Sequence, residues 1–231
     1  MREDHTGDDP PHEGKRGKID ECLIKLDANG RPYIPFPEHP ELRLTPWKED
    51  DIDDLVELFN QPNIAKWGHS RPFPYLKEHV LDSLPNLGRN DIQYLTILIN
   101  SLPISPNLSI YPKTKLSPIS AVRNKDEKII GTLSVRPSSN FKGDFEISYN
   151  LHDQLTGKGI GKEMVKIGIK LAKWLGIKRL LAFTEIDNHS SKAILRNAGF
   201  TLHAERLVDW PEHRGGGKRS AYIWEIYPQS S

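Results

Sequence analysis

A glycine-rich turn between an alternating strand and an amphipathic helix constrains the fold of this chain more than any other feature. Residues 145–151, FEISYNL, alternate between apolar and polar side chains, which predicts a β-strand. Residues 157–161 read GKGIG, and apolar side chains then recur every three or four positions across 160–175, which predicts a helix. Gly176 follows at the position of a left-handed helix cap. Strand, turn and helix together indicate a mixed α/β domain.

The remaining sequence supplies further strands and helices around this unit. Strands are expected at 42–47, 119–123, 129–136, 179–184, 201–210 and 220–227, and helices at 52–60, 76–84 and 191–198. Residues 91–118 contain four prolines and predict a long loop, either a functional segment or a dispensable insertion. Because this order requires both hairpins and helix crossovers, the expected fold class is α/β (α+β), with a mixed central sheet flanked by helices.

The first forty residues differ from the rest of the chain in composition. Residues 1–18 consist almost wholly of glycine, proline, histidine and charged residues, and four prolines follow before residue 41. Such a segment buries too little apolar surface to offset the entropy of ordering it. We therefore expect residues 1–40 to form a disordered or extended N-terminal segment and residues 41–231 to form one domain.

Charge and cysteine content exclude several classes of protein. The chain carries 32 Lys and Arg against 31 Asp and Glu, a net charge of +1, whereas nucleic-acid-binding domains usually have a clear basic excess. The single cysteine, Cys22, excludes an intramolecular disulfide and a Cys-rich zinc site, and the nine histidines show no metal-binding spacing. No apolar run approaches the ~18 residues of a membrane span, and the first residues lack the apolar core of a secretory signal. We expect a cytoplasmic or nuclear protein that binds no metal, nucleic acid or membrane.

The glycine turn has the chemistry of an anion-binding site. Glycines let backbone amides approach a ligand closely, and a helix N-terminus carries about half a positive charge, which together suit a phosphate. The spacing is not that of a Walker loop, because three residues separate Gly157 from Gly161, and Lys162 is followed by glutamate. The dinucleotide fingerprint also fails, because its third glycine arrives one residue early. A plain strand-to-helix turn remains open as the alternative.

Four motifs, in order, resemble the GNAT superfamily of N-acetyltransferases. They are the strand EISYNL at 146–151, the turn TGKGIG at 156–161, the sequence DNHSS at 187–191 and the helix end ILRNAGF at 194–200. The opening LRLTPWKEDDIDDLVELFN also resembles the first strand and helix of the ribosomal-protein-alanine acetyltransferase-like branch. The resemblance covers about residues 42–227 and implies the GNAT acyl-CoA N-acyltransferase fold, splayed between its fourth and fifth strands.

This resemblance implies direct transfer of an acetyl group from acetyl-CoA to a primary amine, on a protein N-terminus or a small molecule. The amine arrives as an ammonium and must lose a proton before its nitrogen attacks, so a general base is needed. Glu146 is the first candidate base, with an ion-paired structural carboxylate as the alternative, and Glu185 is the second candidate. Ser191 matches a family serine near the sulfur and is the third catalytic candidate.

The resemblance also assigns residues to acetyl-CoA, which is expected as a co-substrate. The backbone of the splayed strand would hold the acetyl group and its oxyanion, and the glycine turn would hold the pyrophosphate. Asn188 would bind the pantetheine arm, or else cap the helix that follows it. The expected coenzyme-binding residues are Tyr149, Asn150, Leu151, Thr156, Gly157, Lys158, Gly159, Ile160, Gly161, Lys162, Asn188 and Ser191.

Two positions depart from the family pattern. Thr156 stands where Gln or Arg is usual, and Leu195 where many members have the tyrosine that protonates the departing thiolate. These departures keep open an alternative function, a catalytically inactive GNAT-like module that binds coenzyme A or regulates a partner. The resemblance does not specify the acceptor, although Trp67, Trp210 and the loop at 211–219 are candidates to line its pocket. A monomer or a homodimer is expected.

Overall fold

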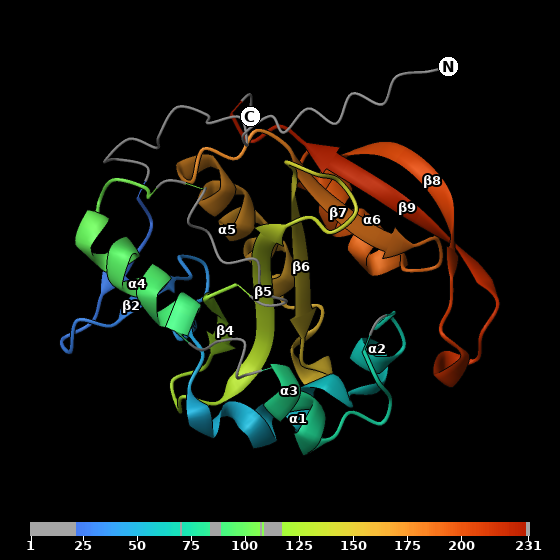
Figure 1. Ribbon diagram of the computed structural model, residues 1–231, viewed down its shortest axis with the longest axis horizontal. Helices are drawn as coiled ribbons and strands as arrows, with labels where there is room; N and C mark the ends of the chain where they lie inside the picture. Colours follow the sequence, from blue (N-terminus) through green and yellow to red (C-terminus); the bar gives the residue numbers. More distant parts are fainter. Residues whose placement is uncertain (1–21, 70, 84–88, 107, 109–116, 230–231) are drawn as a thin grey trace, which may run out of the picture.

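A nine-stranded mixed sheet forms the centre of the computed structural model, which describes residues 22–69, 71–83, 89–106, 108 and 117–229 (Figure 1). The strands are β1 (Lys25–Leu26), β2 (Pro32–Pro35), β3 (Arg43–Pro46), β4 (Ile119–Arg123), β5 (Ile129–Pro137), β6 (Phe145–Leu151), β7 (Leu180–Glu185), β8 (Thr201–Asp209) and β9 (Lys218–Ile226). Their order across the sheet is β1-β2-β3-β4-β5-β6-β7-β9-β8. Neighbouring strands pair antiparallel throughout, except that β6 and β7 run parallel.

Helices cover both faces of this sheet. They are α1 (Ile52–Phe59), α2 (Pro62–Ala65), α3 (Lys77–Ser83), α4 (Arg89–Ser101), α5 (Ile160–Trp174) and α6 (His189–Asn197), with short 3-10 helices η2 (Glu49–Asp51), η5 (Asp153–Leu155) and η6 (Glu212–Arg214). Ala121 of β4 belongs to the apolar core beneath α1, and its neighbour Val122 to the larger core beneath α5. Because successive side chains of a strand point to opposite faces, the two cores lie on opposite sides of the sheet.

The mixed α/β architecture expected from the sequence is therefore confirmed. Each expected strand and helix is present, and its ends lie within two residues of the expected ones. The splay expected between the fourth and fifth strands falls between β6 and β7, because two further strands precede them.

Those two further strands correct the expected N-terminal boundary at residue 40. β2 pairs with β3, and the side chains of Ile34 and Phe36 are only 0% and 1% exposed in the core beneath α5. Residues 32–36 are therefore part of the folded sheet rather than an extended surface segment, because β3 offers a free edge for them to pair with. Residues 1–21 lie outside the described part of the chain.

The long loop expected across 91–118 is wrong over its first part, which belongs to α4. Tyr94 and Leu98 lie one helical turn apart and are both buried in the core beneath α5. This pair holds the helix against the sheet although most of its other described side chains are exposed or half-buried. Residues 107 and 109–116 of the expected loop lie outside the described residues.

Gly168 lets α5 lie close against the sheet. A Cβ atom added there would stand 2.4 Å from Cδ1 of Ile147 on β6, a distance that real Cβ contacts do not reach. Close packing at this point fixes α5, and hence its N-terminus, relative to β6.

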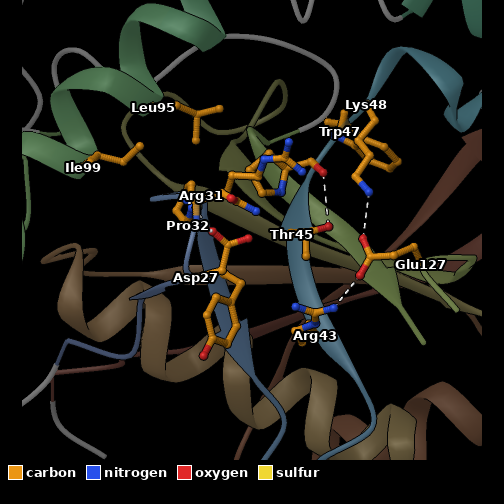
Figure 2. A pocket seen from close by; sticks show the side chains of 13 residues that line it. Asp27, Arg31, Pro32, Arg43, Thr45, Trp47, Lys48, Leu95, Ile99 and Glu127 are labelled. Atoms are coloured by element: carbon orange, nitrogen blue, oxygen red, sulfur yellow. Dashed lines mark hydrogen bonds and ion pairs between the residues drawn. The ribbon is translucent and has the colours of Figure 1, made fainter. Parts of the chain in front are cut away.

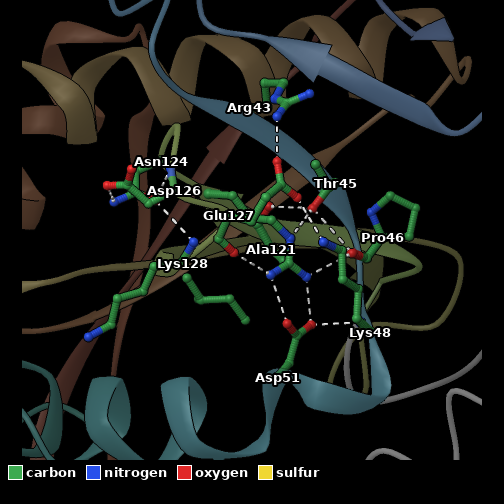
Figure 3. A network of polar contacts seen from close by, with 12 residues as sticks. Arg43, Thr45, Pro46, Lys48, Asp51, Ala121, Asn124, Asp126, Glu127 and Lys128 are labelled. Carbon is green, nitrogen blue, oxygen red and sulfur yellow. Dashed lines mark hydrogen bonds and ion pairs between the residues drawn. The ribbon is translucent and has the colours of Figure 1, made fainter. Parts of the chain in front are cut away.

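Arg123 ties β4 to the start of α1 through a buried network with Asp51, and Figure 3 labels Asp51 within it. Its Nη1 and Nη2 donate to the two carboxylate oxygens of Asp51 at 2.7 and 2.6 Å. Its remaining N–H groups reach Thr45 Oγ1 at 2.8 Å and the carbonyl oxygens of Glu127 and Pro46 at 3.1 and 3.3 Å. All five guanidinium N–H groups thus have an acceptor, which makes this buried charge a structural one.

Candidate active site

The two parallel strands separate soon after they meet. β6 and β7 are paired at Phe145 with Leu180 and at Glu146 with Leu181, and the register contains no later pair. β6 stays paired with β5 as far as Leu151, and β7 stays paired with β9 as far as Glu185. The sheet therefore opens into a wedge between the second halves of β6 and β7.

The glycine turn lies at the N-terminus of α5, the helix of the crossover between these two strands. Gly157 and Gly159 have φ angles of +77° and +85°, the left-handed conformation that side chains disfavour. Apart from its two chain neighbours, no atom of the described residues lies within 4 Å of where a Cβ of Gly157 would be, and Lys158 and Lys162 are exposed. The first amides of a helix have no acceptor within it, so an anion can approach them here.

Other residues of the turn have structural partners. Thr156 donates its hydroxyl to the carbonyl oxygen of Asp153 at 2.8 Å, within the turn. Gly161 faces α6, since a Cβ there would stand 3.2 Å from Cδ1 of Ile194. Its lack of a side chain therefore lets α5 and α6 pack closely.

A hydroxyl pair spans the wedge on the side of these helices. The Tyr149 hydroxyl on β6 lies 2.6 Å from Ser191 Oγ in the first turn of α6, the helix that follows β7. Burial raises the pKa of Tyr149 to about 12, so this phenol keeps its proton at neutral pH. Asn188 caps α6, accepting the Ser191 amide at 3.1 Å, which is the capping role expected as its alternative.

Asn150 and Leu151 on β6 and Ile160 on α5 are the remaining residues that were expected to bind the coenzyme. Asn150 donates its side-chain amide to Thr132 Oγ1 on β5 at 2.9 Å, and Leu151 is the last residue paired with β5. Ile160 is buried in the core beneath α5. The structure thus brings Tyr149 and Ser191 together and places the turn at the same helical layer, whereas Asn150 faces the other side of the sheet.

Glu146 lies at the closed end of the wedge, where β6 and β7 are still paired. It is 5% exposed, and its carboxylate forms an ion pair with Arg136 and accepts the Ser138 hydroxyl at 3.3 Å. Both oxygens therefore have partners. These contacts are those of the ion-paired structural carboxylate that the sequence left as the alternative to a base.

Glu185 lies at the open end of the wedge, as the last residue of β7. Its Oε2 is 3.4 Å from Nη1 of Arg219, and its Oε1 is buried with no hydrogen-bond partner among the residues that the structure describes. The preceding residue, Thr184, accepts Nε1 of Trp224 on the side of α6, so Glu185 points to the opposite face. A buried carboxylate oxygen without a donor is energetically costly, so this oxygen has an unfilled capacity to accept a hydrogen bond.

Arg219 connects Glu185 to a cluster of aromatic side chains. The guanidinium of Arg219 lies 3.9 Å from the ring centre of Trp210, which the His69 ring meets edge to face at 5.0 Å. Trp210 is buried. Arg214 donates to the carbonyl oxygen of Ala65, which joins the β8–β9 hairpin to α2.

The segment around α2 closes the open end of the wedge from below in Figure 1. On the β6 side, the amide of Asn63 lies 3.4 Å from Asp153 Oδ2. On the hairpin side, His69 Nε2 lies 2.9 Å from the carbonyl oxygen of Asp209. Residues 61–69 therefore connect the two edges of the wedge at the end where Glu185 lies.

A cavity of about 620 Å³ lies elsewhere, over β2 and β3 and beside α4 (Figure 2). Leu95 and Ile99 border it, and its charged residues include Arg43 and Lys48, which both bond to Glu127. None of the site residues expected from the sequence lines this cavity. It is therefore separate from the wedge.

Neither metal ligation nor membrane insertion is indicated by the part of the chain that the structure describes. Within it, no three His, Cys, Asp or Glu side chains are grouped to hold a metal ion. Among the same residues, no helix is long and apolar enough to cross a membrane.

A wedge between two parallel strands, with a glycine turn at the N-terminus of the helix that connects them, is the architecture of a coenzyme-dependent acyltransferase. The family model described as acetyltransferase (GNAT) domain matches residues 41–201, more than half of the chain. The protein therefore belongs to the GNAT acetyltransferases, for which acetyl-CoA-dependent N-acetylation is general. The resemblance inferred from the sequence motifs is confirmed.

Solved structures with the same fold include three acetyltransferases of low sequence identity. Ribosomal-protein-S5-alanine acetyltransferase from Vibrio fischeri has a TM-score of 0.59 and 19% identity, over 85% of this chain and 96% of that one. Spermidine N-acetyltransferase from Vibrio cholerae, solved with CoA and spermine, has a TM-score of 0.58 and 13% identity, over 82% and 96%. A GNAT-family acetyltransferase from Bacillus anthracis has a TM-score of 0.57 and 13% identity, over 89% and 98%. No curated protein sequence gives a significant match.

Proposed function

We propose that this protein transfers the acetyl group of acetyl-CoA to a primary amine that enters beside Glu185. Membership of the GNAT family and the wedge between β6 and β7 support the reaction class. The observation that carries the assignment of the acceptor side is the partnerless, buried Oε1 of Glu185 at the open end of the wedge.

The residues around the turn fit the coenzyme. Gly157 and Gly159 leave the first amides of α5 open to a pyrophosphate, and Lys158 and Lys162 add positive charge beside them. Thr156 contributes a bond within the turn in place of a long side chain. Acetyl-CoA supplies an activated acetyl thioester, so the chain's own task is to orient it and to move protons.

Glu185 is our candidate for the group that accepts the proton of the incoming ammonium. Its free Oε1 faces the side of the sheet opposite α6, away from the expected coenzyme side. Arg219 holds the other oxygen, which fixes the orientation of the carboxylate. Glu146, in contrast, has both oxygens occupied and lies where the strands have not yet separated.

Ser191 is our candidate for the proton donor to the departing thiolate. Leu195 leaves the usual tyrosine position without a hydroxyl, whereas Ser191 Oγ and the Tyr149 hydroxyl form a protonated pair within the wedge. Either hydroxyl of the pair can pass its proton to the other, so the donor can be replenished.

The charge around the entrance favours an acceptor without extra positive charge. Arg219 and Arg214 lie on the hairpin, and Arg71 on the segment opposite is half-buried, with a buried Nη1 that has no partner among the described residues. Burial lowers the pKa of Arg71 to about 10, which still leaves it charged at neutral pH. We therefore propose an acceptor whose amine is attached to a neutral or acidic group, such as an acidic peptide N-terminus, rather than a polyamine.

Release of the coenzyme A thiol from acetyl-CoA, measured with a panel of peptide and polyamine acceptors, tests the function. We expect turnover with neutral or acidic acceptors. Glu185→Gln keeps the shape and the Arg219 contact, and we expect it to lower kcat about 100-fold while the Kd for acetyl-CoA stays unchanged. The matched variant Glu146→Gln should keep the wild-type kcat.

The opposite outcomes would assign the site differently. A loss of kcat in Glu146→Gln with normal turnover in Glu185→Gln would make Glu146 the base. Binding of acetyl-CoA without thiol release for any amine would favour the alternative of an inactive coenzyme-binding module.

A further inference from the structure

His39 connects the N-terminal segment to the glycine turn. Its Nδ1 lies 2.5 Å from Oε2 of Glu163, and its Nε2 lies 3.1 Å from the carbonyl oxygen of Lys158 within the turn. Glu163 belongs to the first turn of α5, and its side chain is only 3% exposed. A residue 119 positions earlier in the sequence than Lys158 thus contacts both the turn and the helix that follows it.

These contacts require a doubly protonated ring. A carboxylate and a carbonyl oxygen can only accept hydrogen bonds, and a neutral imidazole has one N–H group to donate. Both bonds form together only when His39 is an imidazolium. Consistent with this geometry, the hydrogen bond to Glu163 raises the pKa of His39 above its ordinary value of 6.5.

The charge of Glu163 is the reason that its contact with His39 affects anion binding at the turn. Its Oε1 also accepts the amide of Glu38 at 2.7 Å, so the carboxylate is fixed beneath the N-terminus of α5. An uncompensated carboxylate at this place would repel an anion bound at the same helix end. The imidazolium of His39 neutralises it on the side of the turn.

Other charged side chains lie near His39 and Glu163, but none of those described takes the place of His39 as the partner of Glu163. Glu38 forms an ion pair with Lys166 of α5 at 2.7 Å, so its charge is already matched. Glu41 favours the charged ring at longer range, while the exposed Lys158 and Lys162 disfavour a further positive charge beside them. Within the described residues, His39 is the cation in direct contact with the Glu163 carboxylate.

We propose that His39 is a positioning residue for the coenzyme: its imidazolium holds the glycine turn in its binding conformation and masks the charge of Glu163. The inference rests on the proposed binding of acetyl-CoA at this turn. When His39 loses its proton, one of its two hydrogen bonds is lost and the site becomes one charge more negative. The affinity for acetyl-CoA therefore falls as the pH rises through the pKa of His39.

Calorimetric titration of acetyl-CoA between pH 6 and pH 9 tests this dependence. For the wild-type protein we expect the Kd to rise about tenfold across the range, the change that one unit of coupled pKa shift produces. His39→Asn keeps a donor near the position of Nδ1, and His39→Gln keeps one near Nε2. Both variants lack the titrating charge, so their Kd should be raised at pH 6 and change less with pH.

Two further variants separate positioning from folding. Glu163→Gln removes the carboxylate that raises the pKa of His39, so we expect the pH dependence of the Kd to move to lower pH while the ring still titrates. His203→Asn, on β8 away from the turn, should retain the wild-type pH dependence. If the Kd of the His39 variants is instead raised over the wild-type Kd by the same factor at every pH, the wild-type pH dependence persists without His39. That result would overturn the proposal and leave a purely structural role.

The reciprocal measurement uses no variant and no turnover. If protonation of His39 and binding of the coenzyme are coupled, binding of coenzyme A must raise the pKa of His39. A tenfold change in Kd corresponds to a rise of about one pKa unit. NMR titration of the imidazole signals with and without coenzyme A should show this rise, and an unchanged pKa would contradict it. Absence of any acetyl-CoA binding by the wild-type protein would instead overturn the proposed function, and this inference with it.

Discussion

The hydroxyl groups of Tyr149 and Ser191 lie 2.6 Å apart and connect the two sides of the wedge. Tyr149 is on β6 beyond its last pairing with β7, and Ser191 is in the first turn of α6, which follows β7. One hydrogen bond therefore joins elements that the sheet no longer joins. Because the coenzyme is expected to lie between the same elements, this pair is a direct point at which to test the chemistry.

Removing either hydroxyl should slow turnover. We expect Tyr149→Phe and Ser191→Ala each to lower kcat by about 10- to 100-fold, because the departing thiolate loses its proton donor or the group that replenishes it. The double variant should be no slower than the slower single variant, since the two hydroxyls act as a unit. Steady-state kinetics at saturating substrates provides the measurement. Wild-type kcat in both single variants would exclude the pair from proton transfer.

Tyr149 should also make the stability of the protein depend on alkaline pH. Burial raises its pKa from 10 to about 12, so the unfolded chain releases this proton at a lower pH than the folded chain does. The contribution of protonated Tyr149 to the free energy of unfolding is therefore fully present below pH 10. It is lost between pH 10 and pH 12, which lowers the free energy of unfolding by up to about 2–3 kcal/mol. Urea unfolding across this range should show a smaller loss for Tyr149→Phe than for the wild type. The exposed Tyr227→Phe serves as the control and should follow the wild type.

The close contact between Gly168 and Ile147 predicts a compensating pair of substitutions. Gly168→Ala places a Cβ 2.4 Å from Cδ1 of Ile147, and overpacking of this kind costs about 1–3 kcal/mol. Ile147→Val removes that Cδ1 atom and alone costs about 1 kcal/mol. The double variant should therefore be more stable than the sum of the single effects. Thermal or urea unfolding measures the coupling, and strictly additive effects would show that α5 shifts to relieve the contact.

Local sequence patterns are sufficient to predict most of the helices and strands of this fold. The strand at 145–151 alternates and the helix at 160–174 has a continuous apolar stripe, so each is visible within a short window. β2 is different, because two of its four residues are proline and its burial depends on pairing with β3. α4 is different again, because few of its side chains reach the core, which leaves only a narrow apolar stripe.

The residues of the candidate site likewise fall into those that local motifs predict and those that they do not. The glycine turn, Asn188 and Ser191 are contiguous motifs and were predictable. The partners that define their chemistry are distant in sequence, since 42 residues separate Tyr149 from Ser191 and 34 separate Glu185 from Arg219. His39 is 124 residues from Glu163 and lies in a segment expected to be outside the domain. No local pattern marks such pairs, because only the pairing of strands and the packing of α5 bring them together.

The buried pair of Arg123 and Asp51 yields the last prediction, which concerns stability rather than turnover. Arg123 is 1% exposed and Asp51 3% exposed, and the two form a bidentate ion pair (Figure 3). Asp51→Asn or Arg123→Met leaves one charge buried without its counterion, and we expect each to lower the free energy of unfolding by about 3–5 kcal/mol. The double variant Asp51→Leu, Arg123→Met removes both charges and should recover part of this loss. Recovery stays incomplete because Thr45 Oγ1 and the carbonyl oxygen of Glu127 lose the donor that Arg123 provides. Urea unfolding measures all three variants, and single variants within about 0.5 kcal/mol of the wild type would show that solvent reaches the pair.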